Sequence, residues 1–83
     1  MVIQQLDYLI GNADRASGSE KMREALVTAL FEIESEGIRV RKALLADLEK
    51  VGHRLIDEGR DDPRTRSMFC ASVRALRAAV SGR

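Results

Sequence analysis

Residues 20–58 read EKMREALVTALFEIESEGIRVRKALLADLEKVGHRLIDE, and this stretch decides the fold. Its apolar side chains recur at steps of three and four residues, the spacing that places them on one face of an α-helix. These side chains are Met22, Leu26, Leu30, Ile33, Val40, Leu44, Leu48, Val51 and Leu55. Because so long a stripe must be buried against something, we predict an all-α fold built on this element.

Gly37 lies in the one doubled interval of the stripe and leaves two structures open. Residues 35–38, SEGI, match a helix stop in which Gly37 is left-handed and Ile38 folds back onto Ile33. Against a break, the stripe keeps its phase, no capping residue follows, and a one-residue connection is too short for a hairpin. An interior glycine costs only about 1 kcal/mol, so a continuous or kinked helix is the favoured expectation.

The N-terminal part predicts a short helix and a linker. Residues 2–10, VIQQLDYLI, carry apolar side chains at helical spacing, and a helix of this length is not stable unless it docks. Residues 11–19, GNADRASGS, have no apolar period and read as a loop or flexible linker. Ser17 or Ser19 is the expected N-cap of the long element.

The C-terminal part predicts a helix over residues 63–80. Asp62 is a candidate N-cap, and proline is favoured at the first helical position, where Pro63 falls. The apolar stripe of this helix, at Phe69, Val73, Leu76 and Val80, should pack antiparallel on residues 40–58.

This hairpin leaves the first half of the long element without a partner of equal length. Either Gly37 bends the chain into a compact bundle, or a second copy covers the exposed half. We therefore expect one helical domain spanning residues 1–83, a small bundle that is dimeric by a slight preference.

Composition fits a soluble helical protein, with 45% hydrophobic and 33% charged residues among 83. Cys70 is the only cysteine, which excludes an intramolecular disulfide and suits a reducing compartment. No apolar run approaches the ~18 residues of a membrane span, and no signal peptide is recognisable. We expect a cytoplasmic protein without membrane contact.

Charge is divided unevenly along the chain. Residues 1–37 hold three bases and seven acids, whereas residues 38–83 hold eleven bases and six acids. From position 63 onward there are five arginines and no acid. This asymmetry suits an acidic partner or antiparallel pairing with a second copy.

Catalytic and metal-binding candidates are few. His53, the only histidine, shares a helix face with Glu49 and Asp57, but one imidazole and two carboxylates make a poor zinc site. Cys70 lies four residues from Arg66 and Arg74, yet cysteine usually just packs. No nucleophile elbow, phosphate-binding glycine loop or HExxH motif occurs. We expect no enzyme, no cofactor and no metal.

The arginines of the last helix offer a second class of function. Arg66, Arg74 and Arg77 fall near one face, with Arg64 at its start, so this helix could lie in a DNA groove. The acids Asp61 and Asp62 and a pI of only 7.9 argue against a nucleic-acid binder. A small DNA-binding transcriptional regulator is therefore the alternative.

The favoured function is a protein–protein interaction module, such as an adaptor, a chaperone or an inhibitor of a regulatory protein. It would present an apolar helical surface to a partner helix, to an acidic surface or to another copy of itself. The expected partner-binding residues are Leu6, Leu9, Ile10, Leu26, Leu30, Phe31, Ile33, Arg74 and Arg77.

Overall fold

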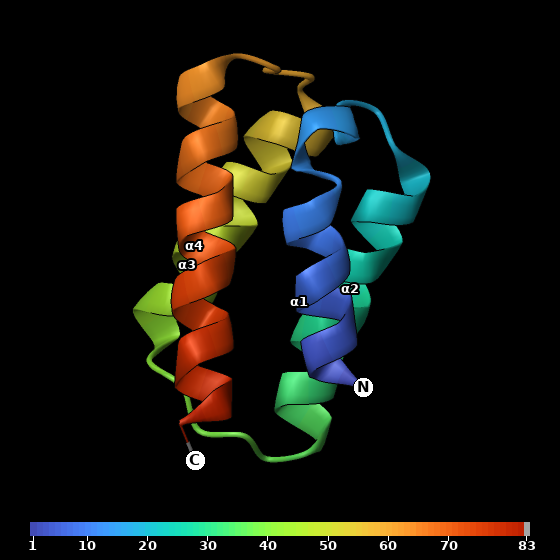
Figure 1. Cartoon of the computed structure of the whole chain (residues 1–83). Coiled ribbons are helices and arrows are strands. Elements are labelled where there is room, and N and C mark those ends of the chain that lie inside the picture. The colour runs from blue at the N-terminus through green and yellow to red at the C-terminus, as the bar shows by residue number, and fades with distance from the viewer. Residues whose placement is uncertain (83) are drawn as a thin grey trace.

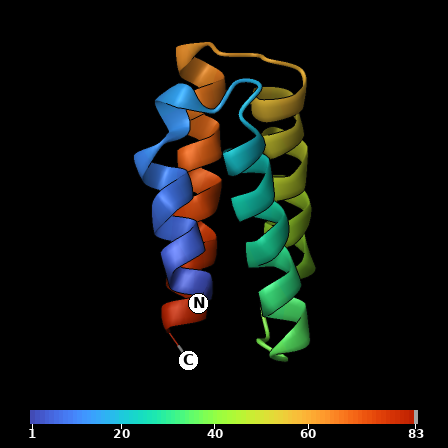
Figure 2. The same cartoon turned by 90° about the vertical axis from the view of Figure 1, so that its right-hand side faces the viewer.

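The computed structural model describes residues 1–82 and shows an antiparallel bundle of helices (Figure 1). Its four α-helices are α1 (Val2–Gly11), α2 (Glu20–Ser35), α3 (Lys42–Gly52) and α4 (Pro63–Ser81). α1 packs on both α2 and α4, and α3 packs on α4, while α2 and α3 approach each other much less closely. Consequently α2 and α4 lie diagonally across the bundle (Figure 2). The prediction of an all-α fold is confirmed.

Residues 20–58 form two helices where the sequence favoured one. α2 ends at Ser35, and Gly37 adopts the left-handed conformation with φ of 65°. The N–H of Ile38 donates to the carbonyl of Ile33 (3.0 Å), and that of Gly37 donates to the carbonyl of Glu34 (3.2 Å). These are the two hydrogen bonds of a Schellman motif. The glycine stop, weighed as the alternative, is therefore what the structure adopts.

The apparent continuity of the apolar stripe has a simple explanation. Residues 36–41 are not helical, so α3 begins only at Lys42. Val40 keeps helical spacing with Leu44 in the sequence but lies in this connection, partly buried. A connection of this length is ample for an antiparallel turn between helices.

The linker between α1 and α2 is fixed to the bundle. It contains a 3₁₀ turn, η1 (Ala13–Arg15), and the side chains of Ala13 and Ala16 are buried. The N–H of Gly18 donates to the carbonyl of Ile56 (2.9 Å). Ser19 is the N-cap of α2, and its hydroxyl accepts a hydrogen bond from the N–H of Met22.

α3 continues into a turn of π-helix, η2 (His53–Asp57), where the N–H of Glu58 donates to the carbonyl of His53 (3.0 Å). Gly59, at φ of 68°, follows this turn. Asp62 then caps α4, as predicted, since its Oδ1 accepts the N–H of Thr65 at 2.8 Å. α4 runs back along α3 and completes the expected hairpin.

The core is filled from all four α-helices. Its fully buried large side chains are Leu6, Leu9, Met22, Ile33, Leu48, Leu55, Phe69, Val73 and Leu76. α1 thus packs on α2, whose apolar stripe a second copy could otherwise cover. No helix within residues 1–82 combines the length and apolar character required to cross a membrane.

Candidate interaction surface

α2 carries a second line of residues on the side opposite the core. Glu20, Glu24, Val27, Phe31 and Glu34 are all exposed and follow one another at steps of three and four. We call these five residues the outer face of α2. Two of them are large and apolar: Phe31 is 68% exposed and Val27 is 57% exposed. One turn apart on a helix, they form the apolar centre of a face with acidic ends.

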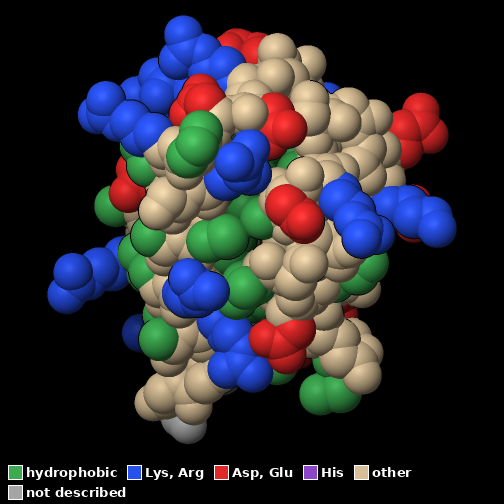
Figure 3. All heavy atoms as spheres, turned by 45° about the horizontal axis from the view of Figure 1, so that its top comes forward, with side chains coloured by type: hydrophobic (Ala, Val, Ile, Leu, Met, Phe, Trp, Pro, Cys, Tyr) green, Lys and Arg blue, Asp and Glu red, His purple; other side chains and the backbone are tan. Residues whose placement is uncertain are grey.

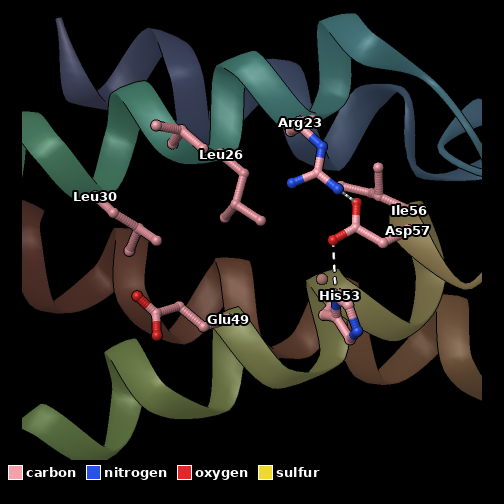
Figure 4. A pocket seen from close by; sticks show the side chains of 9 residues that line it. Arg23, Leu26, Leu30, Glu49, His53, Ile56 and Asp57 are labelled. Atoms are coloured by element: carbon pink, nitrogen blue, oxygen red, sulfur yellow. Dashed lines mark hydrogen bonds and ion pairs between the residues drawn. The ribbon is translucent and has the colours of Figure 1, made fainter.

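A groove of about 250 Å³ lies beside this face, between α2 and α3 (Figure 4). Its apolar walls include Val27, Leu30 and Ile56. Gly52 forms part of its floor, where an added Cβ would lie 2.7 Å from Cδ2 of Leu26. The absence of a side chain at Gly52 therefore lets α2 lie against α3 here.

Charged side chains close one end of the groove. Arg23 reaches across from α2 to form an ion pair with Asp57 (Figure 4). His53 Nδ1 lies 2.7 Å from the other oxygen of Asp57, and its Nε2 lies 3.2 Å from Glu58. The π turn closes an i→i+5 hydrogen bond and so holds more residues per turn than an α-helix, and residues four and five positions after His53 both reach its ring. This cluster ties α2 to η2 across the widest seam of the bundle.

The structure divides the expected apolar contact residues between core and surface. Leu6, Leu9, Leu26 and Ile33 are buried within this chain, with at most 8% exposure. Three of them lie in the core, whereas Leu26 also lines the groove between α2 and α3 (Figure 4). Ile10 and Leu30 are partly buried, and Phe31 stands free on the outer face of α2.

Val27 is an exposed apolar residue that the sequence did not predict as a contact residue. It belongs to neither the apolar stripe nor a recognisable motif. Its spacing of four from Phe31, on the side of the helix away from the stripe, is the signal that could have found it.

Arg74 and Arg77, the two arginines among the expected partner-binding residues, differ in their surroundings. Arg77 joins α4 to α1, with its Nε 2.6 Å from Oδ1 of Asp7. By hydrogen bonding, this guanidinium lowers the pKa of Asp7 below its usual range. Arg74 is exposed and has no ion-pair partner among residues 1–82. Arg66 forms an ion pair with Asp61, with its Nη1 2.6 Å from Oδ1 of Asp61.

Lys and Arg side chains project from several sides of the molecule, including the side where Figure 1 shows α4 (Figure 3). Acidic side chains are interspersed among them in this view. Both signs of charge are thus present on the side of the molecule that Figure 3 shows.

The reactive side chains are not assembled into one site. His53 lines the groove between α2 and α3, while Cys70 lines a different groove beside α1 and η1. Within residues 1–82, no three His, Cys, Asp or Glu side chains are arranged to hold a metal ion. The outer face of α2 and its groove are therefore the best-defined candidate site.

Comparison with protein-family models, with curated proteins and with solved structures finds no match to this chain.

Proposed function

We propose that this chain is a non-enzymatic interaction module that binds a partner protein through the outer face of α2 and the adjoining groove. The observation that carries the proposal is the exposure of Phe31 (68%) and Val27 (57%) at helical spacing. A partner helix laid along α2 would cover both side chains at once, the usual way in which an amphipathic helix is recognised.

The energetics favour such a contact. Full burial of a large apolar side chain gains about 1.5–3 kcal/mol, and Phe31 and Val27 still expose more than half of their surface. Covering both would supply a few kcal/mol before the cost of ordering the partner. This gain suits a regulated contact of moderate affinity, as an adaptor, a chaperone or an inhibitor would need.

The proposal is tested by photo-crosslinking. We would replace Phe31 by a photo-crosslinking phenylalanine and irradiate the protein in extract of its source cells. We expect a crosslink to a partner protein, and this crosslink should be lost when the same chain also carries Val27→Asp. The matched control carries the same analogue at Arg41, an exposed residue between α2 and α3, and should not give this crosslink. If the crosslinked products at position 31 are the same with and without Val27→Asp, the proposal is overturned.

A DNA-binding regulator has less support, because Arg66 and Arg77 already hold Asp61 and Asp7. A low-salt gel shift lost on Arg74→Ala, together with no crosslink at position 31, would favour that alternative instead.

A further inference from the structure

α4 carries an exposed face that complements the outer face of α2. Its members are Arg64, Met68, Ala71, Arg74, Ala75 and Ala78, all exposed, which we call the outer face of α4. Met68 is 46% exposed, and the alanines beside it would allow a second helix to approach closely. This face is basic and apolar, whereas the outer face of α2 is acidic and apolar.

The two faces also match in the order and spacing of their residues. On α2, Glu24 and Glu34 are ten residues apart and flank Val27 and Phe31. On α4, Arg64 and Arg74 are likewise ten residues apart and flank Met68 and Ala71. At about 1.5 Å per residue, each charged pair spans about 15 Å. Two helices laid side by side can therefore pair both charges while their apolar centres meet.

None of these four charged side chains has an ion-pair partner within residues 1–82. Pairing them with a second copy would break no ion pair of the bundle.

We infer that the outer face of α2 binds the outer face of α4 of a second copy of this chain. The inference rests on the proposed function, since it names the partner of the same surface. Because α2 and α4 lie diagonally in the bundle, each copy can use both faces at the same time. Such a head-to-tail contact does not close on two copies and adds further copies instead.

The contact should be weak. A stable interface buries about 800 Å² on each partner, more than helix segments of about 15 Å provide. We expect the mean molar mass to rise gradually above 9.2 kDa as concentration increases, with no plateau at the dimer. Added salt should reduce the rise, since exposed charges are screened.

A charge-exchange experiment tests the inference. Variant A carries Glu24→Lys and Glu34→Lys, and variant B carries Arg64→Glu and Arg74→Glu. We would measure light scattering at protein concentrations between about 1 µM and about 1 mM. The self-association of each variant alone should be weaker than that of the parent by on the order of tenfold. Mixed in equal amounts, A and B should associate again, because every contact between them pairs opposite charges. Circular dichroism confirms that each variant is folded.

The matched control carries the same change in net charge as variant B at two exposed positions between α2 and α3, outside both faces and the grooves beside them. It is Arg39→Glu/Arg41→Glu, and it should associate as the parent does.

Other outcomes overturn the inference. A monomeric parent at every concentration would do so, as would a dimer plateau that variants A and B leave unchanged. If position 31 still crosslinks to a different protein in a manner sensitive to Val27→Asp, the proposed function stands without self-association. If the protein neither self-associates nor gives a crosslink at position 31 that is sensitive to Val27→Asp, the proposed function is overturned as well.

Discussion

α1 decides which surface of α2 is available, and Leu6→Ala tests its docking. Leu6 has no exposed surface, and α1 packs on both α2 and α4. Removing a fully buried leucine side chain beyond Cβ costs about 3–4 kcal/mol through lost burial and a residual cavity. A domain of this length has a total stability of about 4–12 kcal/mol. A single truncation on this short helix should therefore remove about a quarter of the stability or more.

The loss is large enough to measure in two ways. Urea titration followed by circular dichroism gives the free energy of unfolding directly. An unfolding entropy of about 2.1 cal/mol/K per residue gives about 0.17 kcal/mol/K for the chain, so 3 kcal/mol corresponds to a fall in Tm of about 17 °C. The control is Gln4→Ala, at an exposed position of α1, which should lie within about 0.5 kcal/mol of the parent.

A different result would change the functional interpretation. If Leu6→Ala unfolds within about 0.5 kcal/mol of the parent, α1 contributes little to the folded state. The α2 side chains that it covers would then be accessible to a partner. In that case the core face of α2 would become a candidate contact surface, and the outer face of α2 would lose its priority.

Three further substitutions test local features. Gly37→Ala should lower the free energy of unfolding by about 1–2 kcal/mol because alanine is strained at positive φ. In Gly11→Ala the added Cβ meets no neighbour, so this control should stabilise the protein by up to about 1 kcal/mol. Equal urea midpoints for the two variants would contradict this prediction. Gly52→Val should cost about 1–3 kcal/mol in the same assay because its Cβ would crowd Leu26, and a neutral result would show that this side chain yields freely. The pKa of Asp62 is lowered, mainly by the backbone N–H that it caps, so its stabilisation is complete above the usual value of 3.8 and is lost as pH falls through the lower folded value. The Tm of the parent should thus fall more between about pH 5 and about pH 2 than that of Asp62→Asn, and parallel curves would refute the role of this carboxylate.

Much of the fold was accessible from local sequence signals. The apolar period placed the helices, and the Asp-Pro pair placed the start of α4 at Pro63, where the structure has it. These signals work because helix periodicity and capping act within a few residues. The Schellman signal at Gly37 was also local, yet it competed with an apolar phase that continued across the break.

The candidate site was harder to reach from the sequence. The apolar period marks Leu26 and Ile33 as buried but does not say whether their own chain or another covers them. Phe31 is among the contact residues that the sequence predicts, but only the fold separates it from the predicted leucines that are buried in the core. Val27 became a candidate once the direction of the α2 core was known.

Local sequence signals placed α1, α4, the capping residue of α4 and the uneven charge, because each depends on the residue types or on interactions between near neighbours. The tertiary structure decided how the helices share their apolar faces. α1 docks against α2 and α4 and closes the bundle, which buries the predicted seam and leaves the acidic outer face of α2 diagonal to the basic outer face of α4. The physical reason is that burial depends on contacts between residues distant in sequence, and their pairing follows from the packing of the whole chain.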